Sequence, residues 1–293
     1  MRALSLYSRL PSIDIPTLLS AILLFSGSLM NYVLRLREQD RFEPGPWSAL
    51  DPGYLADTWE HRREILPMFT IADFLAAFGW FSLCVPIIQV AWILSKGGRR
   101  RFGMHLLICA FAISGSLAEL LGRLMTIGIE SAADWISRYF NLDNWLDEDS
   151  GDGLGWRVLE VANFLTTAIV IWIDAFMWFA LSGILITIFF SVRSDKEENP
   201  DFGRRWSIFG LIIGVLSLID FFAFAFSFGE FGYTRQITMY VSLTNSVLFL
   251  PAWLIILSYQ LPKASAKFES DADPTEREPM VENGGFSDEI ELS

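Results

Sequence analysis

Cysteine and histidine are scarce in this chain, and their scarcity excludes several classes of protein. Only two of the 293 residues are cysteine and only two are histidine. Cys84 and Cys109 both fall inside apolar runs, so no disulfide framework is expected to hold the loops together. His61 and His105 are too few for the histidine-rich iron and zinc sites of membrane enzymes. We therefore expect no metal and no cofactor.

Other absences narrow the function further. No lysine lies inside an apolar run, which excludes a retinal Schiff base, and no Gly-x-Ser-x-Gly nucleophile elbow occurs. The formal net charge is −12, and no basic face suited to nucleic acid is evident. We do not expect an enzyme. An intramembrane enzyme that uses carboxylates as acid and base is a weaker alternative, since it needs a nucleophile or metal that the sequence does not display.

Apolar sequence, in contrast, is abundant. Hydrophobic residues make up 52% of the chain and aromatic residues 15%, which is typical of a polytopic helical membrane protein. Crossing a bilayer core of roughly 30 Å takes about 20 helical residues, and the longest run, 158–192, exceeds that length. The sequence predicts an all-α bundle of six transmembrane helices, at residues 15–34, 65–94, 103–128, 158–192, 206–228 and 237–261.

Lysine and arginine in the connecting segments predict the orientation. With a cytosolic N-terminus, thirteen basic residues lie inside and eight outside, and the Lys96–Arg101 cluster is the strongest signal. Both termini are therefore predicted to be cytosolic, in the plasma membrane or an endomembrane. In the outer segment 129–157, the spacing of Trp135 and Ile136 with Tyr139 and Phe140 predicts a short amphipathic helix on the membrane surface.

The segment 262–293 is predicted to be a disordered cytosolic tail. It holds nine acids and three bases and few large apolar residues. It forms a region distinct from the transmembrane domain, residues 1–261, and its candidate partner is a cytosolic protein.

Each predicted helix carries one strongly polar group. Measured from the cytosolic ends at about 1.5 Å per residue, these groups lie roughly 21–32 Å deep, in the outer half of the bilayer. Asp174 is the most conspicuous, because a charged carboxylate within a membrane span is costly and usually has a partner or a function. The six groups are Asn31, Asp73, Glu119, Asp174, Asp220 and Asn245.

Acids outnumber bases in this layer. Glu119 and Arg123 are spaced to bond within one helix as a structural ion pair. One arginine satisfies at most two carboxylates well, so the other acids must be protonated, hydrated or paired with a cation. Asp174 and Asp220 are the candidate cation or proton groups and Asp73 a candidate entry ligand; the candidate ligand set is completed by Asn245 and by Asn163, which shares a helix face with Asp174.

Two functions are consistent with such a layer. The first is a transporter or channel-like protein that binds a proton, cation or cationic solute in a carboxylate-lined cavity of the outer half-bilayer. The second is a non-transporting scaffold or receptor-like protein, in which the polar groups bond the helices together. An offset of 101 residues that maps Asp73 to Asp174 and Glu119 to Asp220 suggests a duplicated helix pair, as transporters often carry, or a chance alignment.

Overall fold

The computed structural model describes residues 13–41, 54–98, 100–139, 154–193, 201–226 and 240–271, and they form an all-helical fold. Six long helices in it contain stretches apolar enough to cross a membrane, as the sequence predicts. The helices are α2 (Ile15–Arg41), α3 (Tyr54–Leu94), α4 (Phe102–Tyr139), α5 (Leu154–Arg193), α6 (Arg204–Ala225) and a last helix in which the π-helical segment η3 (Thr244–Phe249) continues as α8 (Leu250–Asp271).

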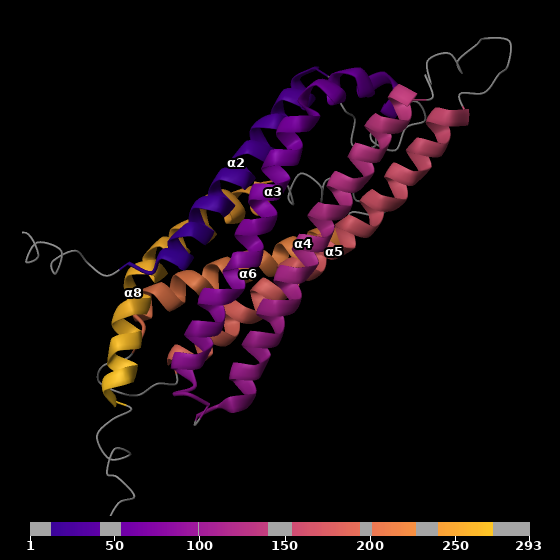
Figure 1. The fold of residues 1–293 in the computed structure, drawn as a ribbon. Helices are drawn as coiled ribbons and strands as arrows, with labels where there is room; N and C mark the ends of the chain where they lie inside the picture. The colour runs from indigo at the N-terminus through magenta and orange to yellow at the C-terminus, as the bar shows by residue number, and fades with distance from the viewer. Residues whose placement is uncertain are drawn as a thin grey trace, which may run out of the picture.

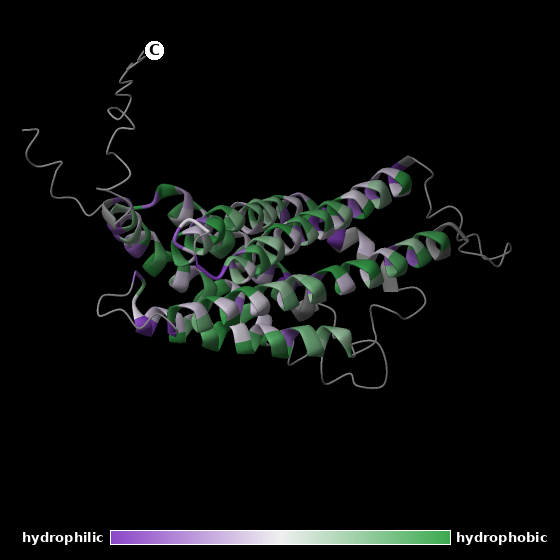
Figure 2. Ribbon diagram, turned by 90° about the horizontal axis from the view of Figure 1, so that it is seen from below, coloured by the Kyte–Doolittle hydropathy of each residue, from purple (hydrophilic) through white to green (hydrophobic). Residues whose placement is uncertain are grey.

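Successive helices pack side by side along the bundle (Figure 1). α8 closes the arrangement by packing against α2 and, less extensively, against α6. The backbone N–H of Asp14 donates to the carbonyl of Ser258 at 2.9 Å, so the start of α2 lies against α8. Hydrophobic residues cover most of the length of the helices (Figure 2), and large apolar side chains are exposed on all six, as lipid contact requires.

The main hydrophobic core lies in the half of the bundle where α2 begins and α3 ends. Trp206 and Trp253 stack there with ring centroids 4.6 Å apart. A Cβ on Gly210 would lie 2.9 Å from Nε1 of Trp253, and one on Gly214 would lie 3.2 Å from Leu185. The small-residue pair of α6 therefore lets two neighbouring helices approach closely.

Glycine also brings α2 and α3 into backbone contact. A Cβ on Gly79 would lie 2.7 Å from the backbone nitrogen of Leu24, and a Cβ on Gly27 would overlap the backbone of Ala76. Gly79 is therefore required for the observed spacing. Further along, Ser20 donates to Ser82 at 2.8 Å.

Four helices are clearly longer than expected, and the first of them, α2, runs on past the predicted end at residue 34 to Arg41. α4 continues unbroken to Tyr139, so Trp135 and Ile136 lie on a membrane-length helix and not on the separate surface helix predicted for 129–157; Phe140 lies outside the described residues. α3 already begins at Tyr54. α8 extends past Leu261 to Asp271, so residues 262–271 are helical where disorder was predicted; residues 272–293 lie outside the described residues.

The extended ends of α3 and α4 are held together by their own contacts. Trp59 is buried with Ala133 and Leu159 of α5. Its indole donates to Ser137 at 3.0 Å. Arg62 forms an ion pair with Glu130. Arg63 and Arg138 both form ion pairs with Asp134, and Arg63 also donates to the hydroxyl of Ser137. We call these residues, 59–63 with 130–138, the helical cap.

Candidate functional site

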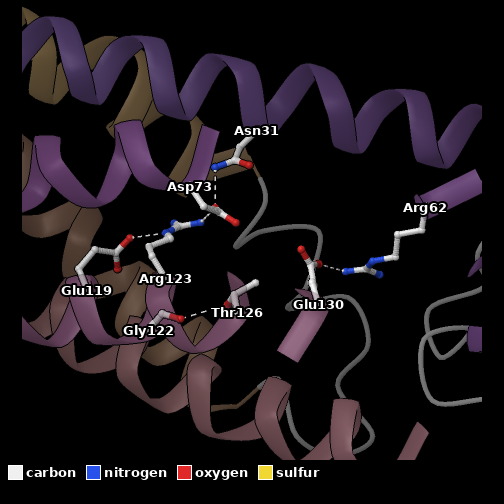
Figure 3. A network of polar contacts seen from close by, with 8 residues as sticks. All are labelled: Asn31, Arg62, Asp73, Glu119, Gly122, Arg123, Thr126 and Glu130. Carbon is white, nitrogen blue, oxygen red and sulfur yellow. Dashed lines mark hydrogen bonds and ion pairs between the residues drawn. The ribbon is translucent and has the colours of Figure 1, made fainter. Parts of the chain in front are cut away.

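A buried network centred on Arg123 joins three helices (Figure 3). Arg123 of α4 donates through Nε to Oε1 of Glu119, one turn earlier, at 2.8 Å. It also donates through its terminal nitrogen to Oδ1 of Asp73 on α3 at 2.9 Å. The same Asp73 oxygen accepts the side-chain amide of Asn31 on α2 at 3.0 Å. Glu119 is fully buried and Asp73 nearly so, whereas 23% of the Arg123 side chain is exposed.

Asp174 of α5 faces this network from the fourth helix. Its Oδ1 would lie 3.7 Å from a Cβ on Gly122, which places the carboxyl against the helix that carries Glu119 and Arg123. Its electrostatic partners are Glu119, Arg123 and Arg35. Because Gly122 has no side chain, the Asp174 carboxyl can approach the α4 backbone at this level.

We call Asn31, Asp73, Glu119, Arg123 and Asp174 the carboxyl network. It contains three acids, while the guanidinium groups that act on them are those of Arg123 and, at Asp174, Arg35. One oxygen of Asn31 and the second oxygen of Glu119 are buried and make no hydrogen bond of normal geometry within the described part of the chain. Among the described residues, the three acids therefore outnumber the two guanidinium groups, and Asp73 and Glu119 are shielded from water.

The fifth and sixth polar groups of the predicted layer, Asp220 and Asn245, form a separate cluster. Asp220 of α6 and Asn245 of η3 are both fully buried. Oδ1 of Asp220 accepts the Ser242 hydroxyl at 3.1 Å, and Oδ2 accepts the Asn245 amide at 3.3 Å. We call these three residues the Asp220 cluster. Within the described ranges, no hydrogen bond or ion pair links it to the carboxyl network.

The predicted polar layer is thus two sites and not one. The structure joins Asn31, Asp73, Glu119, Arg123 and Asp174 across α2 to α5, and Asp220 to Asn245 across α6 and η3. The predicted Glu119–Arg123 pair is present. Asn163 is half-buried on α5, eleven residues before Asp174, and is therefore about 16 Å along the helix from the carboxyl network.

Sequence reasoning missed Ser242 and Arg35. Ser242 precedes Asn245 by three residues, a spacing that places both on one helix face, and this signal was available. Arg35 directly follows the predicted span 15–34, whereas the structure places it within α2. The link from Arg123 to Asp73 required knowledge of how α3 and α4 pack.

One cavity in the described bundle lies apart from the carboxyl groups. A narrow gap between α3, α4 and α5 has room for about one water molecule, and its walls are mostly apolar, with Cys84, Ser116 and Met177 among them. Among the described residues, no three His, Cys, Asp or Glu side chains are grouped as a metal site would require.

Ser242 supplies the hydroxyl group of the two clusters, and that hydroxyl donates to Oδ1 of Asp220. Comparisons of this chain with protein-family models, with curated proteins and with solved structures find no match.

Proposed function

We propose that this chain is a transporter or channel-like membrane protein that binds a proton, a cation or a cationic solute at its buried carboxyl groups. The observation that carries the proposal is the arrangement around Arg123. Asp73, Glu119 and Asp174 come from three different helices and act on one guanidinium group at the same level of the bundle.

This arrangement favours exchange because a surplus of buried acid demands a counter-charge. An uncompensated carboxylate away from water costs several kcal/mol, so it takes up a proton or a cation. Suppose that the helices can pack in two ways. Binding of an exchangeable ion to a buried carboxyl then changes the free-energy difference between the two packings, because the ion has a different affinity for each. In this proposal Asp174 takes up and releases the proton or cation. The Glu119–Arg123 ion pair is the latch, by which we mean the contact that holds the helices together in one packing. Asp73, expected as an entry ligand, becomes part of the latch.

In the proposed orientation both termini are cytosolic. The basic residues of the 95–101 turn support it, since that turn lies at the same end of the bundle as the start of α2. The carboxyl network and the Asp220 cluster then lie toward the outer leaflet.

Flux measurements in proteoliposomes test the proposal. We expect pH- or cation-gradient-driven flux from the purified protein, and its loss in Asp174→Asn and in the double variant Asp174→Asn with Asp220→Asn. Glu269→Gln is the matched control, because Glu269 is an exposed acid at the end of α8. Flux that survives the double substitution unchanged would rule out the proposed role of these carboxyls.

A second candidate is a non-transporting scaffold or receptor-like protein. It is favoured by the direct bonding within the carboxyl network and by the narrowness of the gap between α3, α4 and α5. The polar groups would then act only as bonds between helices, and the cap and the acidic tail would be the working surfaces. Absence of flux together with specific capture of a protein by residues 262–293 in the full-length chain favours this candidate.

A further inference from the structure

The Asp220 cluster differs from the carboxyl network in one decisive respect. Asp220 interacts with the neutral groups of Ser242 and Asn245, and no basic side chain is among its partners in the described ranges. Among the described residues, this fully buried carboxyl has two neutral donors and lacks the charge compensation that Arg123 gives to Asp73 and Glu119.

A second observation indicates a ligand at this place. Asn245 is fully buried, and its side-chain oxygen Oδ1 has no hydrogen-bond partner in the part of the chain that the structure describes, although its amide nitrogen donates to Asp220. An amide oxygen that is buried without a partner loses its hydration and gains nothing in return. Rotation of the amide by half a turn exchanges its nitrogen for its oxygen, so that the oxygen joins the carboxyl oxygens of Asp220 and the hydroxyl of Ser242.

The backbone at this site is also unusual. Asn245 lies in the π-helical segment η3, where the N–H of Leu250 bonds to the carbonyl of Asn245, five residues back. π-helical turns are rare and are often found at functional sites. Hydroxyl groups compensate the neighbouring carbonyls, since Thr244 donates to Tyr240 and Ser246 donates to Ser242, each at 2.7 Å. Irregular helices within the membrane coordinate ions in many transporters.

We propose that Asp220, Asn245 and Ser242 form a binding site for a monovalent hard cation of the size of Na⁺. All the candidate ligands are oxygen atoms, which suits alkali and alkaline-earth cations and does not suit thiolate- or imidazole-seeking metals. One carboxylate balances one positive charge, whereas a divalent ion would leave a net charge in the low-dielectric interior. This inference deepens the proposed function by naming a cation and its site, but binding can be tested without transport.

Equilibrium binding of radioactive sodium to the purified full-length protein in lipid nanodiscs is the direct test. Choline chloride replaces sodium chloride, so that ionic strength is constant. We expect saturable binding that weakens at least about tenfold in Asp220→Asn and in Asn245→Ala, because each removes a ligand. Ser246→Ala is the matched control, because Ser246 lies in the same π-helical segment. Its hydroxyl donates to a backbone carbonyl and not to Asp220. This control is expected to bind sodium as the unmodified protein does.

A gain-of-function variant guards against loss of binding through misfolding. Asn245→Asp places a second carboxylate beside Asp220 and is expected to raise competition by Ca²⁺ against sodium, since the site then carries two negative charges. The proposal is overturned if sodium does not bind saturably, or if Asp220→Asn binds sodium as the unmodified protein does. It is also overturned if the melting temperature of the protein responds to pH but not to the sodium concentration.

The two proposals fail in different ways. Sodium binding that depends on Asp220 in a protein without flux supports this site and contradicts transport. In the opposite case, flux depends on Asp174, but the Asp220→Asn variant binds sodium as the unmodified protein does. That result supports transport and contradicts this site.

Discussion

Oδ1 of Asp73 accepts hydrogen bonds from Arg123 at 2.9 Å and from Asn31 at 3.0 Å, and it thereby bonds α3 to both of its neighbours. A single oxygen is thus the junction of three helices. Because Asp73 is nearly fully buried, the bond to Arg123 operates with little screening by water.

Loss of the arginine should therefore destabilise the bundle strongly. Arg123→Gln leaves Asp73 and Glu119 buried without their cation, and breaking a buried pair in this way costs about 3–5 kcal/mol. Arg138→Gln is the control, since 63% of that side chain is exposed and an exposed pair contributes about 0–1 kcal/mol. Unfolding by denaturant in mixed micelles measures both. Equal destabilisation by the two variants would contradict a central role for Arg123.

A double-mutant cycle isolates the bond between Asp73 and Arg123. The two residues share one hydrogen bond, so Asp73→Asn and Arg123→Gln should be non-additive by about 0.5–3 kcal/mol, with the double variant less destabilised than the sum. The free energies of unfolding of the two single variants and the double variant are needed. Additive effects would mean that the bond makes no contribution in solution.

The contact between α2 and α3 predicts opposite effects at two glycines. Gly79→Ala forces a Cβ to within 2.7 Å of the Leu24 backbone, which must separate the helices and lower the melting temperature. Gly128→Ala on α4 meets nothing within 4 Å and should stabilise the helix by up to about 1 kcal/mol, because alanine is the better helix former. Thermal unfolding in detergent compares the two. A melting temperature that falls equally in both variants would contradict the close approach.

Two tryptophans test the helical cap. Trp59 is buried against Ala133 and Leu159, while Trp135, on the same extension of α4, is 61% exposed. Trp59→Ala should lower the free energy of local opening of the helical cap by about 3 kcal/mol. Trp135→Ala should change that free energy little. Hydrogen exchange of the backbone amides in residues 54–66 and 130–139 reports this opening. Faster exchange in the Trp135 variant than in the Trp59 variant would place the core of the cap elsewhere.

Single cysteines test the proposed orientation. Arg100→Cys and Lys263→Cys should react with a membrane-impermeant maleimide from one side, and Ser131→Cys from the other. All three positions are exposed, whereas the native Cys84 and Cys109 are half-buried within candidate spans and should be protected by the bilayer. Labelling of Arg100→Cys and Ser131→Cys from the same side would contradict the six-span arrangement.

The six helices could be predicted because long apolar runs have few alternatives in a bilayer. Their ends could not. The charges at Arg62, Arg63, Glu130 and Asp134 are typical of a loop, yet here they neutralise one another between two helices. That pairing depends on which faces of α3 and α4 meet, and neither helix reveals it alone.

The polar layer shows the same limit. Depth along a helix follows from residue number, and it correctly placed Asn31, Asp73 and Glu119 at one level. Rotation about the helix axis does not follow from it, so the separation of Asp220 and Asn245 from the other four groups was not foreseen. The π-helical segment η3 adds a further irregularity, because its sequence, Thr244–Phe249, contains no proline or glycine.

The length of α3 has a consequence for what the protein presents to its surroundings. At 41 residues the helix is about 60 Å long, roughly twice the thickness of a bilayer's hydrocarbon layer. Its neighbours α2 and α4 pack along it, and two prolines, Pro67 and Pro86, lie inside it. Because the helix is about twice as long as the hydrocarbon layer is thick, an upright α3 extends beyond that layer.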